Sequence, residues 1–144
     1  MARDLSLAVR KAIIAVLEDD AAVTAIVPVA RIHAVEAPAD PVWPFIRYGF
    51  ATRLPFHATG IDGTRIAGAL HGFAKGTQED GVSALGAAMA AAIDGVDGRG
   101  LTLPLEHEPA AVAHVAWTGS RILRDGDEAG AYQVVVSFEA VVVG

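Results

Sequence analysis

The sequence contains no cysteine among its 144 residues. This absence excludes disulfide scaffolds, cysteine-based zinc sites and thiol nucleophiles. Charged residues are also scarce, at 19% of the chain, where soluble domains average about 25%. Apolar residues make up 53%. Either the core is unusually complete for this size or another subunit covers part of the apolar surface. We favour the second explanation and expect a homo-oligomer.

Long hydrophobic runs are missing as well. A helix that spans a bilayer needs roughly 18 to 20 apolar residues, and the valine-rich segment near the C-terminus is interrupted by Gln133, Ser137 and Glu139. The first residues show neither an apolar export segment nor a small-residue cleavage pattern. We therefore expect neither membrane insertion nor export.

An excess of positive charge is the third feature that the sequence lacks. The formal net charge is −6 at pH 7, whereas tight binding to nucleic acid phosphates needs a basic surface. We do not expect the chain to bind DNA tightly on its own. Its length suits one domain and is too short for two of ordinary size, so we predict a single domain over residues 1–144.

Three segments show helical periodicity. Apolar residues recur at helical spacing over residues 4–18. Asp19-Asp20 then offers a cap for a short helix over residues 21–27, which Pro28 ends or closely follows. A third helix is predicted from residue 77 to residue 95. Its Gly81 and Gly86 predict close packing of a small-residue face against a sheet.

Strand-forming residues follow in five segments, at residues 31–33, 45–50, 65–73, 111–123 and 132–143. A turn at residues 125–130 predicts a hairpin between the last two. Residues 51–63 carry Pro55, Gly60 and Gly63 and are predicted as a long hairpin loop. The expected fold is α+β, with a mainly antiparallel sheet, helices packed on one face and the order α-α-β-β-β-α-β-β.

Motifs for catalysis are incomplete throughout the chain. No G-x-x-x-x-G-K-[ST] phosphate loop occurs. Ser83 misses the G-x-S-x-G pattern by one residue and lies in a predicted helix. The 125–130 turn starts like a calcium loop, but Ala129 and Val136 stand where oxygen ligands are required. We therefore expect no catalytic residue and no cofactor.

Metal ligands are equally scattered. None of the histidines, at positions 33, 57, 71, 107 and 114, forms an H-x-x-x-H pair. In Glu106-His107-Glu108, neighbouring side chains on an extended chain point to opposite faces. We expect no metal site, and we expect His57 to face solvent rather than to regulate a contact by titrating near neutral pH.

Aromatic residues allow two interpretations. Trp43 and Trp117, with Phe45 and Tyr48, would suit either a ligand-stacking surface or positions in the core and at interfaces. Aromatic residues on strands more often take the second role, and we favour it.

Several strings along the chain follow a family pattern: LEDDAAVTAIV at 17–27, PFIRY at 44–48, HGFAK at 71–75 and SRILRDG at 120–126. In order and spacing they resemble the small tail-terminator or tail-completion proteins of long-tailed phages and gene transfer agents, over nearly the whole chain. Phe73 takes the place of a tryptophan in that pattern, and residues 51–63 depart from it.

This resemblance implies a structural protein without enzymatic activity. Its α+β subunits would form a hexameric ring that caps the tail tube, ends tube polymerisation and forms the tail side of the head–tail junction. The implied partners are further copies of the chain, the tail tube protein, a neck or connector protein, and double-stranded DNA that passes without specific binding; no membrane is implied. The implied location is the tail of a virion or gene transfer agent, assembled in the bacterial cytoplasm.

Charge and symmetry add two expectations to this picture. Six chains of charge −6 give a ring of formal charge −36, and a lumen lined by acidic groups would repel duplex phosphates and let DNA slide. Stacked rings continue indefinitely unless one face fails to match, so we expect one face to dock the tube and the other to meet the neck. Subunit contacts are expected at strand edges and in residues 51–63. The residues expected in these contacts are Arg53, Phe56, His57, Arg121 and Arg124.

Two alternatives to a tail terminator remain open from the sequence. A neck or head–tail connector protein would share the small size, the ring symmetry and the absence of an active site. A small enzyme or ligand-binding α+β domain would instead show convergent polar groups in a pocket.

Overall fold

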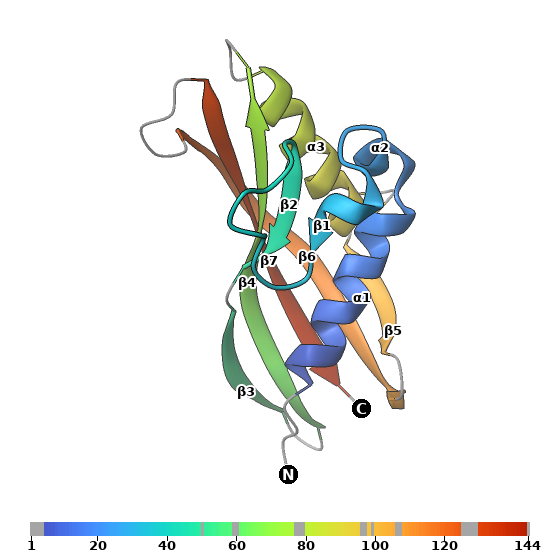
Figure 1. Cartoon of the computed structure of the whole chain (residues 1–144). Helices are drawn as coiled ribbons and strands as arrows, with labels where there is room; N and C mark the ends of the chain where they lie inside the picture. The colour runs from blue at the N-terminus through green and yellow to red at the C-terminus, as the bar shows by residue number, and fades with distance from the viewer. Residues whose placement is uncertain are drawn as a thin grey trace.

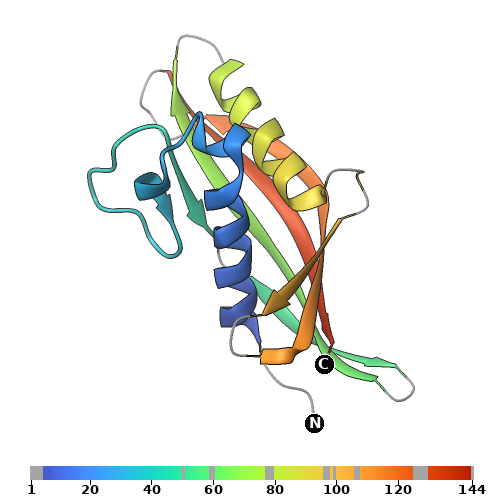
Figure 2. The same ribbon diagram turned by 90° about the vertical axis from the view of Figure 1, so that its right-hand side faces the viewer.

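A seven-stranded sheet, with helices on one of its faces, makes up the part of the chain that this computed structural model describes (Figure 1). That part comprises residues 5–49, 51–58, 61–76, 80–95, 98, 100–105, 108–124 and 130–143. For residues 55–58, 61–62, 108–110 and 143 the description covers the backbone alone. Figure 2 shows α1 and α3 lying side by side across the sheet.

The elements follow one another along the chain as α1 (Ser6–Asp19), α2 (Ala21–Thr24), the 3-10 turn η1 (Val29–Arg31), β1 (Ile32–His33), β2 (Phe45–Tyr48), β3 (Thr52–Ala58), β4 (Ile61–Lys75), α3 (Asp80–Asp94), β5 (Leu101–Leu105), β6 (Glu108–Arg124) and β7 (Ala131–Val143). The strand order is β1-β2-β4-β7-β6-β5, and β3 pairs with β4. Only the β1–β2 pair, among the described strands, is parallel.

The α+β class, the mainly antiparallel sheet and the helices on one face are confirmed. The predicted hairpin of the last two strands is also present, because β6 and β7 pair from Val112 and Val143 to Arg124 and Tyr132. Most of the turn between them, residues 125–129, lies outside the described residues, as does the predicted start of the third helix at Thr77.

The predicted loop over residues 51–63 is wrong. Thr52 pairs with Ala67 and Ala58 with Ile61, so most of this segment forms β3 and the first part of β4. Pro55 indicated a loop, but a proline is tolerated in a strand at the edge of a sheet. β5 was not predicted as a strand either. The described structure therefore has two strands, β3 and β5, that the predicted order lacks.

The core fills the space between the sheet and the helices. In β7, buried residues alternate with half-buried ones, which is the pattern of a strand with one face in the core. The large side chains buried almost completely include Ile13 and Leu17 from α1, Leu85 and Met89 from α3, and Ile46, Ile66, Leu70 and Phe138 from the sheet. Among the described residues, no helix has the length and apolar character needed to cross a membrane.

Local chemistry explains where α2 begins and how closely α3 packs on the sheet. The side chain of Asp20 accepts a hydrogen bond of 3.0 Å from the backbone N–H of Val23, which caps α2 as predicted. In α3, Gly86 lies directly on Val134 of β7. The predicted close packing against the sheet is therefore present at Gly86, but the prediction is wrong for Gly81, which is exposed.

Alanine at Gly86 tests this close packing. A Cβ added there would lie 2.7 Å from Cγ2 of Val134, whereas one added at Gly81 in the same helix meets nothing within 4 Å. Alanine stabilises a helix by about 0.5–1 kcal/mol relative to glycine, but overpacking costs about 1–3 kcal/mol.

We therefore expect Gly86→Ala to lower the free energy of unfolding by about 1 kcal/mol and the control Gly81→Ala to leave it unchanged or raise it by up to about 1 kcal/mol. Urea unfolding measures both values. An equal gain in both variants would contradict the packing described.

Candidate functional site

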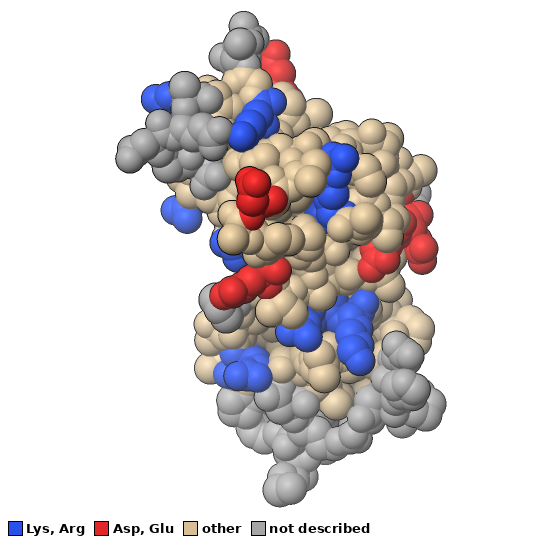
Figure 3. Space-filling view, viewed as in Figure 1, with Lys and Arg blue, Asp and Glu red and all other residues tan. Residues whose placement is uncertain are grey.

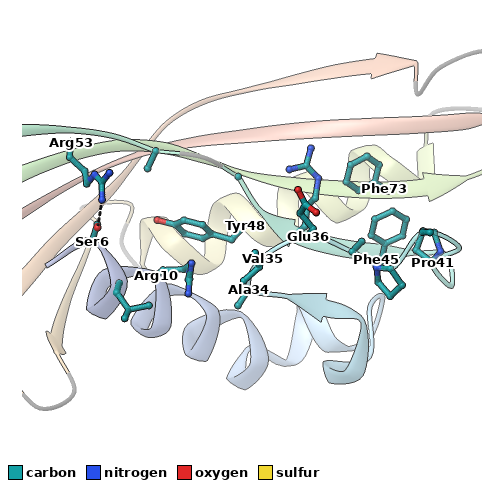
Figure 4. A pocket seen from close by; sticks show the side chains of 17 residues that line it. Ser6, Arg10, Ala34, Val35, Glu36, Pro41, Phe45, Tyr48, Arg53 and Phe73 are labelled. Carbon is teal, nitrogen blue, oxygen red and sulfur yellow. Dashed lines mark hydrogen bonds between the residues drawn. The ribbon is translucent and has the colours of Figure 1, made fainter. Parts of the chain in front are cut away.

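The described surface has a basic groove on one flank of α1. It has a volume of about 770 Å³ and lies between α1, the segment 34–41 and strands β2 and β3 (Figure 4). Arg10, Arg47 and Arg53 line it, with Glu36 as its one acidic lining residue. We call it the arginine groove. Its excess of positive charge is notable because the whole chain carries −6.

Each arginine comes from a different element. Nη1 of Arg53, on β3, donates a hydrogen bond of 3.1 Å to Oγ of Ser6 on α1. The guanidinium of Arg47, on β2, lies over the ring of Phe73, with Cζ 5.6 Å from the ring centroid. Nε of Arg10, on α1, is buried and has no hydrogen-bond partner among the described residues. The fold thus gathers three cations at one place.

Two titratable groups near the arginines are neutral at pH 7. Burial raises the pKa of Tyr48 to about 12, although Arg10 opposes this shift. Burial also lowers the pKa of His71, and the charge of Arg47 lowers it further. Nδ1 of His71 is hydrogen-bonded to the side-chain amide of Gln133. The arginines therefore set the sign of the groove's charge.

Aromatic rings form the wall beside Arg47. Phe45 and Phe73 are stacked with centroids 4.5 Å apart, and Trp43 meets Phe45 edge-on at 5.1 Å. Phe45 and Tyr48 are buried, which confirms the prediction of core positions for these two. Trp117 lies apart from this cluster, on β6 beside α3, so the four aromatic residues do not form one ligand-stacking surface.

A second groove, of about 660 Å³, lies between α3 and β6. We call it the α3–β6 groove. On the helix side its lining residues are small, and on the strand side it exposes Trp117 and Ile122, at 42% and 37% of their surface. Nε1 of Trp117 donates to Oγ of Ser120 at 3.0 Å. This groove is mainly apolar, in contrast to the first.

Beside the α3–β6 groove, the sheet has an open edge. β5 pairs with β6 up to Val115, so residues 117–124 of β6 have a described strand on one side only. Pro55 lies in β3 and Pro104 in β5, and proline hinders pairing at a sheet edge. The 117–124 segment contains no proline. It is thus more open to pairing than β3 or β5.

The five residues predicted for subunit contacts fall into two groups. Arg53 lies in the arginine groove. Phe56 and His57 are placed on β3, opposite Gly63 and Asp62, but their side chains are outside the description. Arg121 and Arg124 are exposed on the open part of β6. The fold does not bring the two groups together.

Sequence reasoning missed Arg10 and Arg47. Arg10 lies within the helix predicted over residues 4–18, and nothing in its local pattern indicates that β2 and β3 lie beside it. One signal was available, since no acidic residue occurs between Asp40 and Asp62, a stretch that contains both Arg47 and Arg53.

The described residues contain no group of three or more His, Asp or Glu arranged to hold a metal ion. Glu106 and His107, and most of the predicted 125–130 turn, lie outside the described residues. His71 and His114 lie on different strands and have Gln133 and Thr102 as their partners.

Two comparisons with known proteins give matches that cover almost the whole chain. The model of the family described as Tail completion protein gp17 matches residues 11–143. In a solved structure described as "Virion of native gene transfer agent (GTA) particle", one chain superposes with a TM-score of 0.78, at 18% identity, over 97% of this chain and 98% of that chain. A search of curated proteins finds no match. The resemblance noted in the sequence is thus confirmed, and the chain belongs to the tail completion protein gp17 family.

Proposed function

We propose that the chain is a structural component of a phage or gene transfer agent tail and assembles into a hexameric ring. The ring caps the tail tube, ends its polymerisation and forms the tail side of the head–tail junction. The observation that carries the proposal is the family match over residues 11–143. The likeness in fold to a chain of a gene transfer agent virion, over nearly the full length of both chains, supports it.

The surfaces of the monomer support a ring rather than a two-fold dimer. A two-fold contact needs a surface that is complementary to itself, whereas a ring needs two different surfaces that fit each other. The arginine groove lies beside β2, and the α3–β6 groove lies beside the open part of β6, toward opposite edges of the sheet. One is basic and the other apolar, so neither resembles the other.

We propose two subunit contacts: the open segment of β6, residues 117–124, and the hairpin in which residues 52–58 of β3 pair with residues 61–67 of β4, which we call the β3–β4 arm. The first combines unpaired backbone groups with exposed apolar side chains, the two features through which strands add to a sheet edge. The β3–β4 arm exposes Leu54 at 53% of its surface. Arg121 and Arg124 on the first surface, and Arg53, Phe56 and His57 on the second, are the contact residues proposed.

Passage of DNA through the ring is proposed from charge alone. Each chain carries −6, so a ring has a large negative excess that disfavours tight binding to duplex phosphates. DNA therefore moves through the lumen without being held. The tail tube protein and a neck or connector protein are the partners proposed for the two faces of the ring.

Aspartate at Ile122 tests the β6 contact. A charge in the α3–β6 groove must lose water on assembly, so we expect Ile122→Asp to raise the concentration for half-maximal ring formation about tenfold or more. Val42, 61% exposed and in the lining of neither groove, provides the control Val42→Asp. Light scattering measures assembly, and circular dichroism checks that both variants fold. Assembly of Ile122→Asp at the wild-type concentration would refute this contact.

Shortening the β3–β4 arm tests the second contact. Leu54 and Arg65 are paired in the register, so replacing residues 55–64 with Asn-Gly joins them through a two-residue hairpin turn. We expect a folded monomer that forms rings about tenfold or more less readily and no longer stops the growth of tail tubes. Tube lengths in electron micrographs show the second effect. Normal rings and normal tube lengths would exclude the arm from assembly.

A further inference from the structure

Hollows of opposite charge lie on the two flanks of α1. The arginine groove is lined by Ser6, Leu7 and Arg10 of this helix and by residues of β2. A smaller hollow of about 410 Å³ is lined by Ala12, Val16 and Asp19 of the same helix and by residues of β5. Because β1-β2 and β5 stand at opposite ends of the strand order, the two hollows are on opposite flanks of the subunit.

The second hollow is lined by Asp19 and Asp20, which together with the preceding Glu18 form a run of three acidic residues that we call the acidic corner. Figure 3 shows red atoms gathered over the end of α1 and blue atoms over its start. Glu18 and Asp19 form no ion pair within the described residues. The last turn of α1 contains no basic residue, although the partial negative charge of a helix C-terminus favours cations there. The corner therefore lacks a cation that its local chemistry favours.

The arginine groove has one carboxylate in its lining against three arginines. Arg10 and Arg47 form no ion pair within the described residues, and neither does Glu36. Nε of Arg10 is buried without a partner. A buried donor that stays unpaired is costly, and a carboxylate brought into the groove from outside would both accept hydrogen bonds and balance the charge.

We infer that the acidic corner of one subunit docks into the arginine groove of the next. This inference rests on the ring proposed above and identifies one of its contacts. The corner and the groove belong to the same chain and lie on opposite flanks of α1, so the contact repeats from subunit to subunit in one direction, as a closed ring requires. Charge at this contact sets the register and direction of assembly.

Two charge-reversed variants test the contact. Arg10→Glu combined with Arg47→Glu leaves one arginine against three carboxylates in the groove lining and so makes the groove acidic, and Glu18→Arg combined with Asp19→Arg makes the corner basic. Asp20 is left unchanged because it caps α2. Each variant alone places like charges in contact, so we expect about tenfold or more protein to be needed for half-maximal assembly. Mixed in equal amounts, the variants can alternate around a ring of six with opposite charges at every contact, and assembly should return to near the wild-type concentration.

Two control variants reverse a single charge of the same sign elsewhere on the surface. Lys11→Glu and Asp80→Arg alter exposed residues that line neither hollow, and both should assemble like the wild type. Circular dichroism verifies folding, and light scattering is recorded with and without purified tail tubes. Wild-type assembly by each reversed variant, or no recovery in the mixture of folded variants, overturns the contact but leaves the ring proposal standing. A wild-type chain that forms no ring, alone or on tubes, overturns both.

Discussion

The antiparallel pairing of β4 with β7 is the constraint on which the other elements depend. It extends from Gly63 and Val143 to Lys75 and Ala131. β2 and β3 pair with the two halves of β4, and β6 pairs with the other edge of β7. Residues that face the helices along this pair form the floor of the core, and Gly86 lets α3 lie directly on Val134. The positions of both grooves follow from this arrangement.

The subunit differs chemically from one flank to the other. Three cations gather where α1 meets β2 and β3, while carboxylates gather at the end of the same helix. The apolar α3–β6 groove accompanies an open strand edge without proline. Unlike flanks of this kind favour head-to-tail assembly over pairing of identical surfaces. In the ring that we propose, charge sets the direction of assembly and apolar burial supplies its strength.

Periodicity in the sequence predicted the helices, the closing hairpin and the α+β class because these features depend on local spacing. It failed at β3, where Pro55 suggested a loop but occupies a sheet edge at which its missing N–H is tolerated. The arginine groove was missed for a different reason. Arg10 and Arg47 are far apart in the sequence and meet only through tertiary packing, which no local pattern encodes. Arg53, Arg121 and Arg124 were predicted as contacts, but the prediction gave no sign that they belong to two separate surfaces.

The most direct test of the account is the solution mass of the wild-type chain, measured by light scattering over a concentration series with and without purified tail tubes. The account predicts a species of six subunits, each of 14.9 kDa, which binds tube ends and stops their growth. A monomer whose mass is independent of concentration, and which leaves tube ends unbound and tubes growing, would contradict it.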